Sequence, residues 1–157
     1  MIRNRLLVAI DQFEAGDAAI DFTIGHAAQS GADVVVLHVR EFPPSLRVPP
    51  LETVGAARDL VESTLLRMRD AGVQASGLVT SAREDTVAKR IVQVAVDEQC
   101  AAIVLGSRRL RGIHRLTGSR IRERVVRTSH LPVIVAPPGL RCSKRALTTA
   151  FSGGVRS

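Results

Sequence analysis

The stretch DVVVLHV at residues 33–39 is an almost continuous run of branched apolar residues. A strand that is covered on both faces of a sheet has this composition, because neither face needs polar side chains. Similar runs lie at residues 5–10 (RLLVAI), 100–105 (CAAIVL) and 131–136 (LPVIVA). A weaker, partly alternating run at residues 73–80 (VQASGLVT) suits a strand nearer a sheet edge. We therefore predict a five-stranded sheet.

Segments with helical spacing of apolar residues separate these strands. They cover residues 17–30, about 51–71 and 85–98, and a fourth helix is expected to start at Ser119, a residue type favoured at helix N-caps. Alternation of strand and helix implies right-handed crossovers, which place parallel strands in one sheet with helices on both faces. The predicted fold class is α/β, a three-layer α/β/α sandwich with a mainly parallel sheet. A ligand site in such a sheet lies beyond the carboxyl ends of the strands, where strand order reverses.

Length and composition indicate one domain. The chain has 157 residues, and we expect a domain at residues 1–137 followed by a basic, flexible tail at residues 138–157. No apolar run reaches the roughly 20 residues of a membrane helix, and the start lacks a signal peptide's cleavage site, so a cytoplasmic protein is predicted. Cys100 and Cys142 form no CxxC pair and are expected to be free thiols.

Several catalytic signatures are missing from the sequence. It contains no GxG pair, no Gly-Lys pair of a Walker loop, and no HExxH, CxxC or GxSxG motif. The four histidines (His26, His38, His114 and His130) are scattered, and structural or incidental roles are expected for them, with His114 the one nearest a candidate phosphate loop. No convincing general base is identifiable, so the sequence predicts no efficient enzyme.

A long glycine-containing loop comes after the strand at residues 100–105. It runs from Gly106 through SRRLRGIHRLT to Gly118 and Ser119, and a helix is expected after it. Free N–H groups at a helix start, together with the helix dipole, favour an anion, and glycine allows a close approach of the backbone. Gly118 and Ser119 are therefore candidate phosphate ligands.

At this loop the sequence resembles the universal stress protein family, whose nucleotide-binding members carry G-x2-G-x9-G-[S/T] after the fourth strand. The resemblance covers roughly residues 3 to 137, including VAID with Asp11, the LHV of the second strand, and RIRERVVRTSHLPVIVAP near the end. It implies a Rossmann-like fold and a stress-response role with an adenine nucleotide, ATP or AMP, as ligand, accompanied by Mg²⁺ if a triphosphate binds.

The resemblance also implies roles for individual residues. Asp11, the backbone of Val39 and Leu105 would face the adenosine, while the ribose and phosphates would be lined by Gly106, Gly118, Ser119 and Arg120, with Arg109 at the turn. It further implies a homodimer in which strand 132–136 pairs with its copy, which would cover an otherwise exposed sheet edge.

The chain departs from the family motif at two places. Arg109 stands where the family has its second glycine, and eight residues rather than nine separate it from Gly118. Gln12 and Phe13 come after Asp11, where the family often has Gly-Ser. Arg109 either reshapes the turn so that backbone N–H groups no longer converge on phosphate, or supplies a charge-assisted contact in their place. Both alternatives remain open from the sequence.

Arginines concentrate between residues 107 and 127. This segment carries eight of them against Glu123 alone, which accounts for the whole formal charge of +7. The segment is either a solvated face or a surface for polyanions, with nonspecific, salt-sensitive nucleic-acid contact as its limit because no aromatic residue accompanies it.

The sequence thus leaves two functions to compare. The first is a regulatory protein that binds an adenine nucleotide at the carboxyl ends of its first and fourth strands through a degenerate phosphate loop. The second is a nucleotide-free dimeric scaffold that acts through contacts with an unknown protein partner and has an arginine-rich surface for polyanions.

Overall fold

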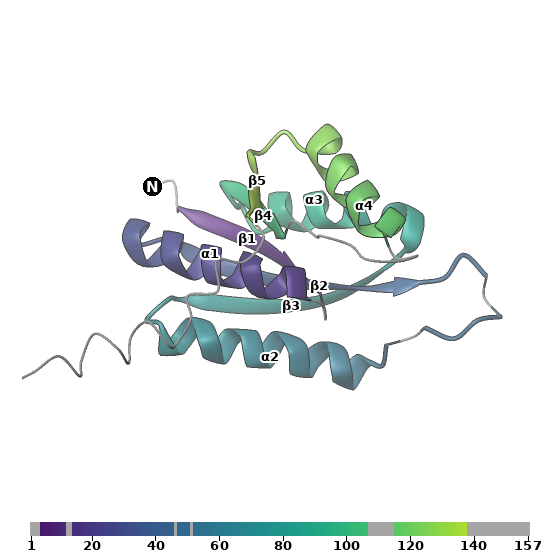
Figure 1. The fold of residues 1–157 in the computed structure, drawn as a ribbon, viewed down its shortest axis with the longest axis horizontal. Coiled ribbons are helices and arrows are strands. Elements are labelled where there is room, and N and C mark those ends of the chain that lie inside the picture. The colour runs from purple at the N-terminus through teal and green to yellow at the C-terminus, as the bar shows by residue number, and fades with distance from the viewer. Residues whose placement is uncertain (1–3, 12–13, 46, 51, 107–114, 138–157) are drawn as a thin grey trace, which may run out of the picture.

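The protein folds as a five-stranded parallel sheet between two layers of helices (Figure 1). The computed structural model describes residues 4–11, 14–45, 47–50, 52–106 and 115–137. The strands are β1 (Arg5–Ile10), β2 (Asp33–Phe42), β3 (Ala75–Arg83), β4 (Ala102–Gly106) and β5 (Val133–Ala136). The helices are α1 (Glu14–Ser30), α2 (Val54–Asp70), α3 (Val87–Asp97) and α4 (Arg115–Thr128), with a 3-10 turn, η1 (Glu84–Thr86), before α3.

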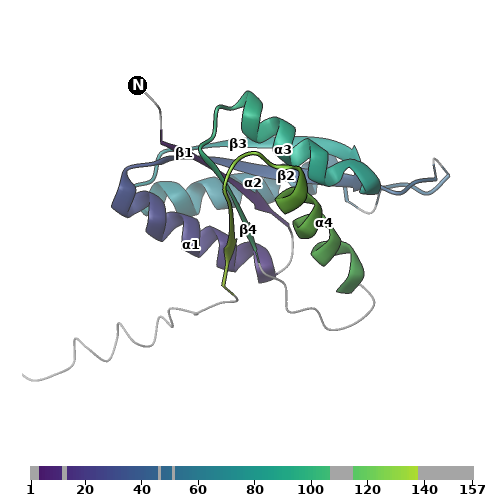
Figure 2. The ribbon, with the colours of Figure 1, turned by 90° about the horizontal axis from the view of Figure 1, so that it is seen from above.

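The strand order is β3-β2-β1-β4-β5, with every pair parallel. The α/β class and the three layers predicted from the sequence are confirmed, and the weakly patterned strand does lie at a sheet edge. Residues in β1 and β2 alternate between two cores because successive side chains point to opposite faces. Val34 and Val36 belong to the core beneath α1 and α2, whereas Val35 and Leu37 belong to the core beneath α3 and α4. Figures 1 and 2 show these two pairs of helices on opposite faces of the sheet.

The structure differs from the sequence prediction mainly at the ends of elements. β2 continues to Phe42 because its residues pair with β3 as far as Phe42 opposite Arg83, a partner that the sequence of β2 does not reveal. The helix expected at Ser119 begins instead at Arg115, so its first turn contains Gly118. The tail at residues 138–157 lies outside the described residues.

Helix α2 lies close to the edge strand β3 because Gly77 has no side chain. A Cβ atom at this position would clash with the side chain of Val61 and lie 2.9 Å from Leu65 Cδ1. At its start, α2 is capped by Thr53, whose hydroxyl accepts a hydrogen bond from the Ala56 N–H at 3.1 Å. The beginning of α2 is thus fixed just above the carboxyl end of β2.

Candidate functional site

The central candidate site lies where β1 and β4 end side by side. The two strands are paired up to Val8 opposite Val104, and each then runs two residues further, to Ile10 and Gly106. The chain leaves β1 for α1 and leaves β4 for α4, and these helices cover opposite faces of the sheet (Figure 2). Strand order therefore reverses between β1 and β4, the position at which open α/β sheets bind ligands.

Two of the predicted site residues are placed by this geometry directly. Asp11 comes immediately after β1 and is partly buried, and Gly106 is the last residue of β4. Because parallel strands end at the same edge, the structure brings both to one end of the sheet.

The side chains of Val39 and Leu105 lie beneath the α3 and α4 layer. Leu105 is buried in that core, and Val39 packs against it from β2. These two apolar side chains form the floor of the candidate site. A ligand above them could therefore form hydrogen bonds at these two residues only with backbone N–H and C=O groups.

The remaining predicted site residues belong to the segment after β4. Gly118 and Ser119 are the fourth and fifth residues of α4, within the helix rather than ahead of it as the sequence predicts, and their side chains are outside the described part of the chain. Only the first few N–H groups of a helix lack a partner within it, so the donors that suit an anion are those at the helix start at Arg115, ahead of Gly118 and Ser119. Arg109 lies outside the described residues, as does His114.

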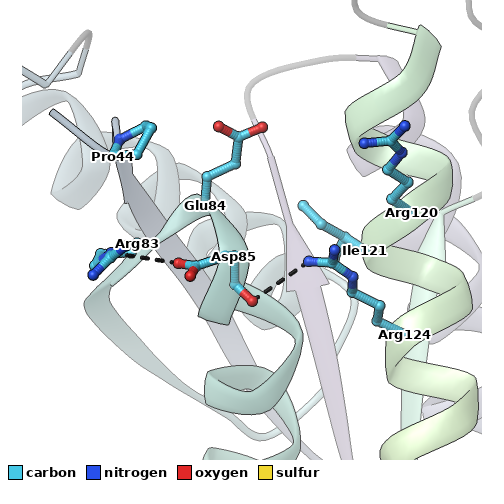
Figure 3. Close-up of a pocket in the computed structure, with 7 residues that line it drawn as sticks. All are labelled: Pro44, Arg83, Glu84, Asp85, Arg120, Ile121 and Arg124. Atoms are coloured by element: carbon cyan, nitrogen blue, oxygen red, sulfur yellow. Dashed lines mark hydrogen bonds and ion pairs between the residues drawn. The ribbon is translucent and has the colours of Figure 1, made fainter.

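Arg120 lines a cleft between α4 and η1 on the same edge of the sheet (Figure 3). The cleft has a volume of about 180 Å³, below the ~300–1,000 Å³ of sites that enclose a whole ligand. Its lining residues come from the connection after β2, the end of β3 with η1, and α4: Pro44, Arg83, Glu84, Asp85, Arg120, Ile121 and Arg124.

One wall of this cleft carries both acidic and basic side chains, whereas the charged side chains of the other wall, on α4, are arginines. Arg83 Nε lies 3.4 Å from Asp85 Oδ1, and Arg124 Nη1 donates a long 3.4 Å hydrogen bond to the Asp85 carbonyl (Figure 3). Arg120 is exposed on the same side of α4 as Arg124, and no other described residue bonds to its guanidinium. Since the one bond of Arg124 here is long and exposed, both α4 arginines can reorient toward an incoming anion at small cost.

His38 belongs to this edge as well, although its sequence context predicts only a structural or incidental role. Its buried ring contacts the carbonyl of Ile10 and the carboxylate of Glu52. Glu52 comes from the proline-rich connection between β2 and α2, and no spacing or motif links it to His38. The pairing becomes visible only once that connection is seen to fold back over the strand ends.

The described residues show no other reactive centre. Burial raises the pKa of the Cys100 thiol to about 11, with a smaller rise from Glu98 and an opposing effect of Arg5, so the free cysteine there is a poor nucleophile. Within the described ranges, no cluster of three or more His, Cys, Asp or Glu side chains could hold a metal ion. None of the helices in these ranges is long and apolar enough to cross a membrane.

Comparison with protein families gives one match. Residues 3–137 match the model of the universal stress protein family, which is the extent expected from the motifs. Comparison with curated protein sequences finds no match.

Solved structures share the fold over most of the chain. A universal stress family protein from Burkholderia pseudomallei is 24% identical, with a TM-score of 0.69 over 88% of this chain and 98% of its own. The universal stress protein from Archaeoglobus fulgidus, solved in complex with dAMP, is 23% identical, with a TM-score of 0.65 over 87% and 100%. An Arabidopsis thaliana family protein with AMP bound is 16% identical, with a TM-score of 0.61 over 87% and 93%.

Proposed function

Since the chain belongs to the universal stress protein family, we propose that it is a regulatory protein that binds an adenine nucleotide at the carboxyl ends of β1 and β4. The observation that carries this proposal is the strand reversal between β1 and β4, which brings Asp11 and Gly106 to one edge. The dAMP and AMP complexes of the Archaeoglobus and Arabidopsis proteins support the choice of adenine nucleotides.

The proposed binding mode divides the ligand between two ends of the site. Asp11 accepts hydrogen bonds from the base or ribose, and the floor is formed by Val39 and Leu105. The phosphates lie toward Gly106 and the first turn of α4, where free N–H groups and Arg120 supply donors and positive charge. ATP would bring Mg²⁺ as a counter-ion, whereas AMP would not require it.

The nucleotide in this proposal is a signal rather than a substrate. His38, the histidine at this edge, already makes contacts through both ring nitrogens, so neither is available as a general base. We therefore expect at most slow ATP hydrolysis, and a cytoplasmic protein whose bound nucleotide changes its contacts with a partner.

Calorimetric titration with AMP, and with ATP plus Mg²⁺, tests the proposal. Binding at or below millimolar nucleotide is expected. Nuclear magnetic resonance of the same mixtures provides a second measurement. If millimolar AMP and ATP produce neither heat nor a chemical-shift change, the proposed function is wrong and the nucleotide-free scaffold remains.

Replacement of Asp11 tests the location of the site. Asp11→Ala should weaken AMP at least about tenfold, equivalent to ~1.4 kcal/mol, because a hydrogen bond to a charged group is lost. Asp33→Ala is the matched control, since Asp33 is also a partly buried aspartate but lies at the amino end of β2. Equal losses in both variants would contradict the assignment.

The same proposal includes a homodimer through β5. This strand is at the sheet edge, with Val133 and Ile134 partly buried and Val135 39% exposed. Pairing with a second copy would cover the edge. Light scattering should give a dimer for the wild-type protein and a monomer for Val135→Lys, and a wild-type monomer at micromolar concentration would refute it.

A further inference from the structure

The ring of His38 joins two segments that meet at the carboxyl edge of the sheet. Its Nδ1 lies 2.9 Å from the carbonyl oxygen of Ile10, the last residue of β1. Its Nε2 lies 2.7 Å from Oε2 of Glu52, two residues before α2. His38 is only 5% exposed, and the Glu52 side chain is 14% exposed, so water competes little for either contact.

Both contacts can be hydrogen bonds only if the pair holds a shared proton. A carbonyl oxygen accepts and never donates, so Nδ1 must carry a hydrogen. Nε2 then faces a carboxylate oxygen, and one of these two atoms must carry a second hydrogen. Without it, two lone pairs would face each other at 2.7 Å in a buried place, which costs free energy rather than gaining it.

Other charged groups at this pair also fix Glu52 in place. Arg40, from the same strand and two residues beyond His38, donates from Nη2 to the Glu52 carbonyl at 2.9 Å. Its guanidinium carbon lies 5.4 Å from the centre of the Phe42 ring, while its Nε is buried without a hydrogen-bond partner. Arg40 thus bonds to the backbone carbonyl of Glu52, and His38 contacts the carboxylate of Glu52.

The contact with Ile10 acts on the site through the next residue of the chain. The Ile10 carbonyl and the Asp11 N–H belong to one peptide unit, and because this unit is planar their directions are coupled. A hydrogen bond that fixes this carbonyl therefore fixes the direction in which the chain enters Asp11. Through its other nitrogen, the same histidine ties the connection before α2 to this point.

We propose that His38 and Glu52 are positioning residues that hold Asp11 for the nucleotide through one shared proton, so that nucleotide affinity depends on the protonation of the pair. This rests on the proposed function of the edge. The protonated pair makes both hydrogen bonds and favours binding. Loss of the proton as the pH rises breaks one of them and releases either the Ile10 carbonyl or Glu52.

Glu52→Gln separates the hydrogen bonds from the proton. A glutamine amide donates to Nε2 of a neutral imidazole, whose Nδ1–H still donates to the Ile10 carbonyl. Both contacts then persist with no shared proton. Glu52→Ala removes the contact instead, and Thr53→Ala is the matched control because it removes the α2 cap next door without touching the pair.

The experiment is AMP titration of the four proteins across a pH series of about 5.5 to 9, the region in which imidazoles ordinarily exchange protons. The phosphate of AMP also changes its protonation with pH, but it does so equally for every variant. Comparing the affinities of the variants at the same pH therefore removes this contribution. At the acidic end of the pH series, the wild type should bind AMP as tightly as Glu52→Gln does. At the basic end, its AMP affinity should be roughly fivefold or more lower than that of Glu52→Gln. Glu52→Ala should bind AMP weakly at every pH, and the AMP affinity of Thr53→Ala should depend on pH as that of the wild type does. A constant ratio of wild type to Glu52→Gln, or equal weakness of Glu52→Gln and Glu52→Ala, would overturn the proposal.

Nuclear magnetic resonance of the unliganded protein keeps this test separate from that of nucleotide binding. The Asp11 amide shift should move with pH in the wild type together with the His38 ring nitrogens, and should stay constant in Glu52→Gln. If AMP fails to bind any variant, the proposed function falls, yet these shifts still decide whether the pair positions Asp11. An Asp11 amide that ignores the His38 ring in the wild type would refute the positioning role.

Discussion

The two ends of the same parallel sheet are built differently. At the amino ends, the helices return to the strands through connections of two to four residues, such as 31–32 before β2 and 71–74 before β3. Backbone hydrogen bonds close these turns, for example from Cys100 N–H to the Ala95 carbonyl at 2.9 Å. At the carboxyl end of β2, residues 43–53 form a longer connection, which side chains such as His38 tie to the sheet.

This difference separates stability from binding. The amino end holds residues with positive φ and a buried cysteine, so substitutions there act on the free energy of unfolding. The carboxyl end gathers ionisable side chains with few backbone constraints, as expected of loops that carry sites on a rigid scaffold. Variants at the amino end should therefore change unfolding without changing nucleotide affinity, and the change should be largest where the backbone is most constrained.

Gly72→Val should have the largest effect. Gly72 has a φ of +76° after α2, and no heavy atom lies within 4 Å of a Cβ built there, so the cost comes from the backbone alone. A β-branched residue in this region should lower the free energy of unfolding by about 1–2 kcal/mol, with a corresponding shift in denaturant midpoint. AMP affinity measured in the absence of denaturant should equal that of the wild type, and a tenfold loss would break the separation of the two ends.

Gln99→Gly should produce a smaller change of opposite sign. Gln99 is the one described non-glycine residue with a positive φ, +54°, at the turn between α3 and β4. Glycine relieves the left-handed strain of ~1–2 kcal/mol but makes the unfolded chain more flexible, so a net gain below about 1 kcal/mol is expected. The denaturant midpoint should rise slightly, whereas a fall would mean that the glutamine side chain stabilises this turn.

The smallest expected effect is the alkylation of Cys100 in the native protein, which should be almost undetectable. Its thiol is buried and its pKa is about 11, above the ordinary value of 9.0, so very little thiolate exists at neutral pH. Iodoacetamide at pH 8 should label Cys100 only after denaturant is added, as measured by peptide mass spectrometry. Because the unfolded thiol ionises from about pH 9, unfolding should become easier between pH 9 and 11, and Cys100→Ala should lose this dependence. Rapid labelling of Cys100 in the native protein would contradict its burial at the amino end of the sheet.

The fold could be predicted from the sequence because its signals are local. Each buried strand is a short apolar run, and each helix has its own apolar spacing, so alternation alone fixes the layers. Strand ends are less local: β2 continues to Phe42 only because β3 pairs with it. The predicted start of α4 was wrong by four residues, since a good N-cap residue at Ser119 outweighed helical continuation upstream.

The site could be predicted only in part, for a related reason. Asp11 and Gly106 directly adjoin the strand ends, so their place at the carboxyl edge comes from the strand assignments. The link between His38 and Glu52 depends on how a proline-rich connection folds back, which no periodicity encodes. Arg109 remains a prediction, because it lies outside the described residues.

The central place of β1 also determines the order in which the sheet can be completed. β1 pairs with β2 on one side and β4 on the other, and Leu6 meets Ala102 across most of the described chain. A ribosome that synthesises the protein from the amino end releases β1, β2 and β3 long before the partner on the other side exists. During this interval one edge of β1, an apolar strand, stays unpaired, so the rate of elongation through residues 84–106 sets how long the nascent chain is exposed to wrong partners.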